Sequence, residues 1–118
     1  MKPRILLVDD DRLLREVIGD FLLMQDYDVD LAEDANIALS FFDPGKYQLA
    51  LIDLVMPGMN GLELMSQLMS IDPEIFCIIM TGYPSVETAY KSMVDGASDY
   101  IIKPFQLKEL LETISKYV

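Results

Sequence analysis

The feature that most constrains the fold is a regular alternation of short apolar runs with longer segments of helical spacing. Continuous apolar runs of about four to eight residues are typical of strands that are buried on both faces of a parallel sheet. Five such runs occur, and the second is weakly patterned. We therefore expect strands at Arg4–Val8, Asp28–Ala32, Leu49–Asp53, Ile75–Met80 and Asp99–Ile102.

Between these runs, apolar residues recur at three- and four-residue spacing, as they do on one face of a helix. The first such segment holds an apolar stripe from Leu13 to Leu22 and ends near Met24. Ser85 can cap the start of the fourth helix, and Gly96 can end it. The later helices are expected at Ala35–Asp43, Gly61–Ser70, Val86–Val94 and Leu107–Ile114.

Strand and helix thus alternate five times along the chain. This order favours a parallel sheet with helices on both faces, joined by right-handed crossovers, which is a three-layer α/β fold. The chain has 118 residues, of which 52% are hydrophobic, and no repeat or linker interrupts it. We therefore expect residues 1–118 to form a single domain.

Composition excludes several classes of function. A net charge of −11 makes the domain a poor binder of nucleic acid, whose phosphates are neutralised by Lys and Arg. The absence of histidine excludes His-ligated metals and histidine general bases. No secretory signature occurs, and no apolar run approaches the roughly 20 residues that a membrane span needs, so we expect a cytoplasmic protein without membrane contact. Cys77, the single cysteine, is expected to be a buried packing residue.

Polar residues follow the predicted strands at the edge where open parallel sheets bind ligands. Taken singly, each has an ordinary explanation. Asp11 is most simply a helix N-cap, Thr81 a turn hydroxyl and Lys103 a surface charge. The set that follows the first, third, fourth and fifth strands is Asp9, Asp10 and Asp11, then Asp53, Thr81 and Lys103.

The conjunction of carboxylates predicts a metal site. If Asp9, Asp10 and Asp53 converge within about 4 Å, each pair of charges repels by about 4 kcal/mol at an effective dielectric constant near 20. A divalent cation turns this repulsion into attraction, and hard carboxylate oxygens without imidazole or thiolate select Mg²⁺. The backbone carbonyl of Val55 can add a further oxygen ligand.

Lys103 and Thr81 supply what a tetrahedral anion needs beside such a metal, namely a positive charge and a hydroxyl donor. The anion that fits this chemistry is a phosphoryl group. Asp53, at the centre of the sheet, is the best-placed nucleophile, and its attack would form an aspartyl-phosphate.

Four segments together resemble the response-regulator receiver domains of two-component signalling: VDDD at 8–11, LIDLVMPGMNGLEL at 51–64, MTGYPSVETA at 80–89 and GASDYIIKPF at 96–105. The resemblance covers essentially the whole chain. It implies a flavodoxin-like (βα)5 fold with strand order 2-1-3-4-5. Within the family, the segment at 80–89 resembles most the receivers of AAA+ transcriptional activators.

The resemblance also implies roles for individual residues. Asp53 would be the phosphoacceptor. Asp10 and Asp53 would bind Mg²⁺ directly, together with the Val55 carbonyl, and Asp9 would act through water or from outside the ion's direct ligands.

Further roles that the resemblance implies belong to residues after the fourth strand. Lys103 and Thr81 would contact the phosphoryl oxygens, and Tyr100 would be the aromatic residue that moves with Thr81 when the domain switches. The Lys103–Pro104 peptide bond would be cis. Val55 and Tyr83 stand at positions that tune the water attacking the phosphate, and an apolar Val55 beside a bulky Tyr83 is expected to hinder it.

Receivers of this family take their phosphoryl group from a sensor histidine kinase, and here the donor histidine must come from another molecule or domain. The surface formed by the fourth helix, fifth strand and fifth helix would relay the signal to an output domain or downstream protein, or through a phosphorylation-linked homodimer. Since the chain stops after the fifth helix, it is either a stand-alone regulator or a receiver excised from a longer transcription regulator, and we favour excision.

Two other interpretations remain open. One is a Mg²⁺-dependent phosphatase of the haloacid-dehalogenase type, which needs a second acid two residues after its nucleophile, where this chain has Val55. We therefore expect no turnover of external substrates. The other is a receiver-like interaction module that takes no phosphate, which would be expected to lack one of the acidic or basic residues that this chain retains.

Overall fold

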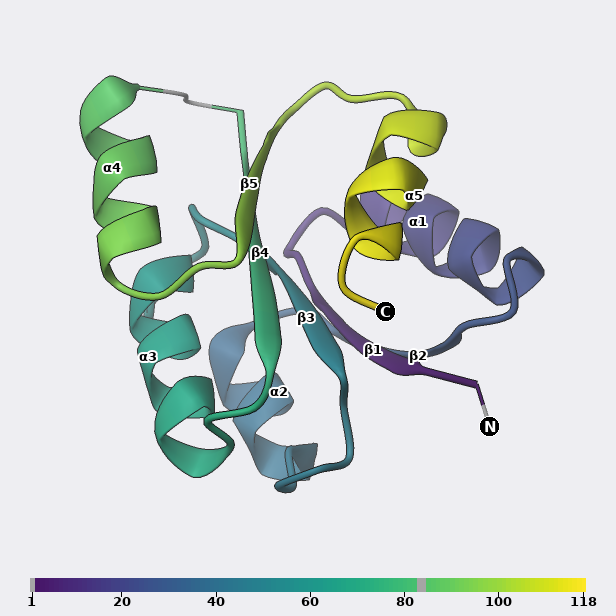
Figure 1. Ribbon diagram of the computed structural model, residues 1–118, viewed down its shortest axis with the longest axis horizontal. Helices are drawn as coiled ribbons and strands as arrows, with labels where there is room; N and C mark the ends of the chain where they lie inside the picture. Colours follow the sequence, from purple (N-terminus) through teal and green to yellow (C-terminus); the bar gives the residue numbers. More distant parts are fainter. Residues whose placement is uncertain (1, 83–84) are drawn as a thin grey trace.

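The structure, a computed structural model, describes residues 2–82 and 85–118. Within these residues strands and helices alternate along the chain (Figure 1). The strands are β1 Arg4–Val8, β2 Asp28–Ala32, β3 Leu49–Asp53, β4 Phe76–Thr81 and β5 Asp99–Ile102. The helices are α1 Arg12–Met24, α2 Ala35–Phe41, α3 Gly61–Ile71, α4 Val86–Val94 and α5 Leu107–Ser115.

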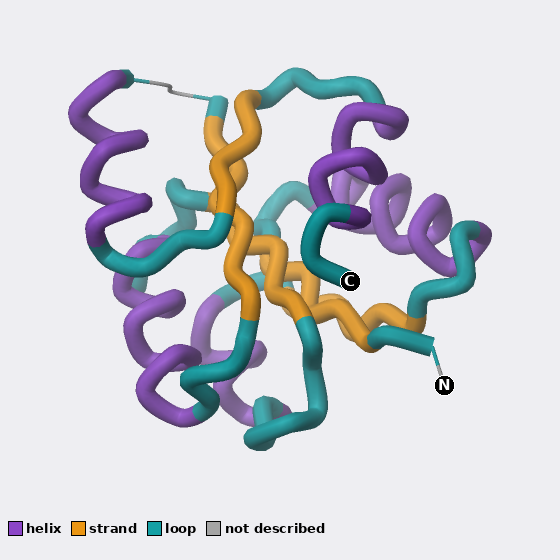
Figure 2. The backbone as a smooth tube through the Cα atoms, in the orientation of Figure 1, coloured by secondary structure: helices purple, strands orange, loops and turns teal. Residues whose placement is uncertain are grey.

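All neighbouring strands are parallel, and their order in the sheet is β2-β1-β3-β4-β5. The sheet forms a central layer between helices (Figure 2). Helices α1 and α5 cover one face, and α2, α3 and α4 lie on the other (Figure 1). This arrangement confirms the predicted three-layer α/β fold and its flavodoxin-like strand order.

The central strands β1, β3 and β4 are largely apolar because successive side chains enter two different cores. Leu6 and Val8 of β1 pack with the buried residues of α2 and α3. Ile5 and Leu7 pack with those of α1 and α5. A polar residue in the middle of β1 or β3 would therefore be buried whichever face it pointed to, which confines polar chemistry to the strand ends.

Helix ends follow the local signals in the sequence. The Asp11 side chain accepts a hydrogen bond from the Leu14 N–H at 3.2 Å, which confirms it as the cap of α1. The Ser85 hydroxyl accepts one from the Thr88 N–H at 2.9 Å and caps α4. Gly96, just beyond α4, has φ +113° and ends that helix as predicted. None of the helices in the described ranges is long and apolar enough to cross a membrane.

Several boundaries differ from the sequence prediction by one or two residues: β4 ends at Thr81 rather than Met80, α3 at Ile71 rather than Ser70, and α5 at Ser115 rather than Ile114. Two further differences have a visible local cause. β4 begins at Phe76 rather than Ile75, because the Ile75 N–H bonds to the Asp72 carbonyl in the turn after α3. α2 ends at Phe41 rather than Asp43. The next residue, Phe42, is extended (φ −82°, ψ 128°), and its buried ring stacks on Tyr47 with 5.7 Å between centroids.

Candidate phosphoacceptor and metal site

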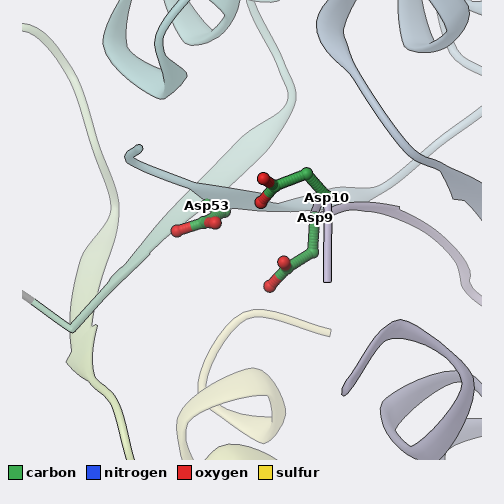
Figure 3. A group of neighbouring side chains, drawn as sticks. All are labelled: Asp9, Asp10 and Asp53. Atoms are coloured by element: carbon green, nitrogen blue, oxygen red, sulfur yellow. The ribbon is translucent and has the colours of Figure 1, made fainter. Parts of the chain in front are cut away.

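The three predicted carboxylates meet at one edge of the sheet. Asp9 and Asp10 follow β1, and Asp53 is the last residue of β3, the strand beside it. One carboxylate oxygen of each lies within 4.8 Å of the others. Figure 3 shows the three side chains leaving these adjacent strand ends. The convergence that the sequence predicted is therefore present.

Asp9 is fully buried and every polar atom it has is engaged. Its backbone N–H donates to the Ala32 carbonyl (3.2 Å), and its own carbonyl accepts from Arg15 Nη1 (2.7 Å). Its Oδ1 accepts from the Asp11 N–H (2.9 Å), and its Oδ2 accepts from Lys103 Nζ (2.7 Å). Asp9 is thus fixed by the protein itself.

Asp10 contrasts with its neighbour, because its side chain is exposed and makes no hydrogen bond or ion pair with any residue in the described ranges. Asp53 lies between these extremes and is 7% exposed. Burial and the charge of Asp9 raise the pKa of Asp53 from 3.8 to about 6, with a smaller contribution from Asp10, while Lys103 and the Val55 backbone N–H oppose the shift. Asp53 therefore pays an electrostatic penalty when ionised without a cation.

Lys103 is the counter-charge of the site. It comes directly after β5, and its Nζ lies 2.7 Å from Asp9 Oδ2 and 3.5 Å from Asp53 Oδ2. Burial alone would lower the pKa of this ammonium, but its hydrogen bond to Asp9 and the charges of Asp9 and Asp53 outweigh that effect and raise it. The Lys103–Pro104 peptide bond is cis, as predicted.

Thr81 ends β4 and is fully buried. Its neighbour Met80 pairs with Asp53 across the β3–β4 ladder, so Thr81 stands one residue beyond the level of Asp53 at the same edge. The Thr81 carbonyl accepts the Lys103 N–H at 2.7 Å, which joins the two predicted phosphoryl contacts through the backbone.

Tyr100 lies in β5 opposite Ile79, and its ring packs against the core under α2 and α3. Its hydroxyl is buried and makes no hydrogen bond of ordinary geometry to a residue in the described ranges. Burial raises the pKa of Tyr100, and the Ser85 backbone N–H acts weakly in the opposite direction. The predicted switch residue therefore lies near the start of α4, and apart from the weak influence of the Ser85 backbone its buried hydroxyl has no hydrogen-bond partner among the described residues.

A glycine allows α3 to approach the strand that carries Asp53. A Cβ on Gly61 would lie 2.4 Å from the Asp53 carbonyl oxygen and 2.9 Å from Leu54 Cα, both of them backbone atoms. The Gly61 N–H donates to the Leu54 carbonyl at 2.9 Å. Gly61, the last residue of the LVMPGMNG segment, is thus needed for close backbone contact beside Asp53.

The sequence prediction did not include Arg15, whose side chain donates a hydrogen bond to the Asp9 carbonyl. The available signal was a basic residue in the first turn of the helix that follows three carboxylates.

Val55, predicted to tune dephosphorylation, is 53% exposed. Tyr83, its predicted partner in that role, lies outside the described residues. Cys77 is fully buried, as predicted, and burial raises the pKa of its thiol to about 12.

Comparison with known proteins identifies the family. The model of the response regulator receiver domain matches residues 5–115. The chain belongs to the receiver domain family. This assignment covers the segments on which the resemblance rested, and it favours the receiver interpretation over the phosphatase one.

Individual receivers agree with the assignment. The chain is 34% identical to the response regulator protein FleR of Pseudomonas aeruginosa over 99% of its own length and 25% of that protein. The chain spans between 25% and 48% of the length of the curated relatives it matches.

Solved receiver structures agree as well. A CheY-like receiver domain protein from Methanospirillum hungatei JF-1 superposes with a TM-score of 0.93 at 34% identity, covering 98% of this chain and 93% of that one. A response regulator from Burkholderia pseudomallei, solved with a phosphorylated aspartic acid, a calcium ion and citrate, superposes with a TM-score of 0.86 at 25% identity, covering 98% of this chain and 72% of that one.

Proposed function

We propose that this receiver domain accepts a phosphoryl group on Asp53 from the phosphohistidine of a sensor histidine kinase, with Mg²⁺ as cofactor. The observation that carries the proposal is the environment of Asp53. Burial and the charge of Asp9 raise its pKa to about 6, and among the described residues the ammonium that faces it is that of Lys103, at 3.5 Å. Such a site is short of positive charge and has an ionisable nucleophile at its centre. The phosphorylated aspartic acid in the Burkholderia relative supports the same chemistry.

The donor set fits Mg²⁺. Asp10 and Asp53, with the Val55 carbonyl, would hold the ion, and Asp9 would act through water because both its carboxylate oxygens already accept hydrogen bonds. Bound Mg²⁺ supplies positive charge that offsets the carboxylate repulsion and the charge on the transferring oxygens. The Burkholderia relative was solved with a calcium ion, which is consistent with binding of a divalent cation by a receiver.

The chain's own residues perform the transfer by positioning. A carboxylate oxygen of Asp53 attacks phosphorus, the phosphorus–nitrogen bond of the phosphohistidine breaks, and the imidazole leaves with the bonding electrons and takes a proton from solvent. Lys103 and Thr81 donate to the phosphoryl oxygens, over which the charge of the transition state is spread. Fixed donors and a fixed nucleophile account for most of the rate in reactions of this kind.

We propose that the domain catalyses its own phosphorylation and dephosphorylation at Asp53 and does not turn over external phosphomonoesters. Hydrolysis of an alkyl ester needs an acid to protonate the departing alkoxide. The position two residues after Asp53 holds Val55, which has no proton to give.

The phosphorylated state would be read through the surface of α4, β5 and α5, where Tyr90, Val94 and Ile102 are exposed apolar side chains. An output domain, a downstream protein or a second copy of the domain would bind there. A cytoplasmic location follows from the kinase partner, and a role in transcription regulation rests on the likeness of residues 80–89 to receivers of AAA+ activators.

Intact mass spectrometry tests the proposal. Incubation with Mg²⁺ and either acetyl phosphate or phosphoramidate should add one phosphoryl group that is stable in acid and labile in base. Excess EDTA should prevent the addition, as should Asp53→Asn. Asp11→Asn is the matched control, because it removes a neighbouring carboxylate while keeping a helix cap, and it should retain the adduct.

Two outcomes would contradict the proposal. The first is the absence of an adduct from both donors, which would favour the receiver-like module that takes no phosphate. The second is an undiminished adduct on Asp53→Asn, which would place the acceptor elsewhere.

A further inference from the structure

Arg15 lies beside the acidic site without pairing with any carboxylate in the described ranges. It is the fourth residue of α1 and is half-buried. Its Nη1 donates to the Asp9 carbonyl at 2.7 Å, a short charge-assisted hydrogen bond from a side chain to the backbone six residues earlier. The contact ties the first turn of α1 to the end of β1.

Helix stability does not explain a cation at this position. Positive side chains are unfavourable near a helix N-terminus, where the macrodipole is itself positive. Arg12, in the same turn, is offset by Glu16 at 3.1 Å and is exposed. Arg15 has no such partner and instead directs its guanidinium at one carbonyl. Local rules are broken most often at functional sites, where another contribution outweighs the local cost.

The carbonyl that Arg15 holds belongs to the peptide that joins Asp9 to Asp10. Since a peptide is planar, fixing its oxygen limits rotation on both sides of the plane, and so limits the direction in which the Asp10 side chain leaves the backbone. Asp9 has three other hydrogen bonds to fix it. The Asp10 side chain has none with a described residue, so its orientation depends on this peptide.

We propose that Arg15 is a positioning residue, which orients Asp10 for Mg²⁺ by holding the Asp9–Asp10 peptide. The proposal rests on the proposed function, because it concerns the metal that phosphorylation would require. Arg15 would act through the backbone and would touch neither the metal nor the phosphoryl group.

The sign of the effect separates positioning from simple electrostatics. A nearby positive charge repels Mg²⁺, so removing the charge of Arg15 would tighten Mg²⁺ binding if charge were all that mattered. If positioning dominates, removal weakens binding. Outer groups that orient metal ligands are typically worth about tenfold or more in affinity.

The experiment titrates the full chain with MgCl₂ alone and follows backbone amide NMR shifts at Asp10 and Asp53, which also report whether each variant is folded. Arg15→Met should weaken Mg²⁺ binding about tenfold. Arg15→Gln removes the same charge with a polar, helix-forming side chain, and it carries the test if Arg15→Met does not fold. Arg12→Met is the matched control and should change the affinity by less than about twofold, because its pair is exposed and screened.

A second measurement separates positioning from damage to the acceptor. The phosphorylation rate of Arg15→Met with phosphoramidate should require about tenfold more Mg²⁺ and then reach the wild-type maximum. Unchanged or tighter Mg²⁺ binding in both Arg15 variants would overturn the proposal, and so would a lower maximum rate with unchanged Mg²⁺ dependence. Absence of Mg²⁺ binding or of an adduct in the wild type would instead overturn the proposed function.

Discussion

The two ends of the sheet both carry charged side chains, but only one end satisfies them. At the amino end, Arg4 lies 3.3 Å from Asp30 and 3.7 Å from Asp28, and the buried Tyr47 hydroxyl donates to Asp30 at 2.5 Å. At the carboxyl end three carboxylates converge. Lys103 pairs with those of Asp9 and Asp53, and the Asp10 side chain has no hydrogen-bond partner in the described ranges.

This difference suggests two roles: the charges at the amino end stabilise the fold, whereas those at the carboxyl end are available to bind a ligand. The carboxylates at the amino end accept protein donors, so removing one of these contacts should cost stability. The excess negative charge at the carboxyl end is a cost to the fold that a cation would remove. Stability measurements can therefore test which end a residue belongs to without any assay of signalling.

The largest effect is expected from Asp53→Asn in metal-free protein. The pKa of Asp53 rises from 3.8 to about 6 on folding, so the folded state holds the proton more tightly and stability falls as the pH rises through this range. At pH 7 the ionised carboxylate costs about 3 kcal/mol, which the neutral amide avoids. Urea unfolding with EDTA should show Asp53→Asn more stable by up to this amount at pH 7, and the gain should shrink as the pH falls towards 4.

The matched control for that prediction is Asp30→Asn, in the middle of β2, whose carboxylate pairs with Arg4 at the amino end of β1. Asp30 accepts from Tyr47 and pairs with Arg4, so its loss should destabilise the fold at pH 7. If Asp30→Asn and Asp53→Asn changed the free energy of unfolding in the same direction, the contrast between the two ends of the sheet would be wrong. Saturating Mg²⁺ should stabilise the wild type and narrow the advantage of Asp53→Asn, because the ion stabilises only a protein that binds it.

A smaller effect is expected from Tyr47→Phe. The Tyr47 hydroxyl is buried and bonds to a charged acceptor, and burial together with that bond raises the pKa of the phenol. Its removal should cost about 2 kcal/mol in the free energy of unfolding, measured in urea. Tyr90→Phe alters a residue that is 72% exposed and should cost almost nothing. A change in Mg²⁺ affinity for Tyr47→Phe would show that the two ends are coupled.

The smallest effect is expected from Asp11→Ala, which tests a residue placed at the carboxyl end but assigned to the fold. Loss of the α1 cap should cost about 1 kcal/mol in urea unfolding, while Asp11→Asn should keep most of that stability. Both variants should bind Mg²⁺ nearly as the wild type does. If Asp11→Ala instead weakened Mg²⁺ binding as much as Asp10→Ala, Asp11 would belong to the metal site.

Most of the fold was predictable because it depends on periodicity. The bounds of β1 and β3 match the apolar runs, because strands buried on both faces are marked along most of their length. The bounds of the weakly patterned β2 and of β5 also agree with the prediction. The end of α2 was not predictable, because the stacking of Phe42 on Tyr47 overrides a continuous helical pattern. Such a contact joins positions whose pairing no local pattern reveals.

The site was predictable in its members but not in its internal order. That Asp9, Asp10 and Asp53 converge follows from parallel topology alone. Asp9 is saturated with hydrogen bonds while Asp10 is exposed. This difference depends on the directions of the side chains at the end of β1, which residue spacing does not predict. Arg15 was missed for the same reason, since its contact is with a backbone carbonyl rather than with a motif residue.

The close contact at Gly61 limits how the backbone at Asp53 can move. Because Gly61 places only hydrogen between α3 and the Asp53 carbonyl, there is no space for this backbone to move towards α3. If Asp53 takes a phosphoryl group, as proposed, the enlarged side chain therefore cannot be accommodated by moving this backbone towards α3. The two residues expected to contact that group, Thr81 and Lys103, are joined by a backbone hydrogen bond, and the buried hydroxyl of Tyr100 in β5 has no hydrogen-bond partner in the described ranges.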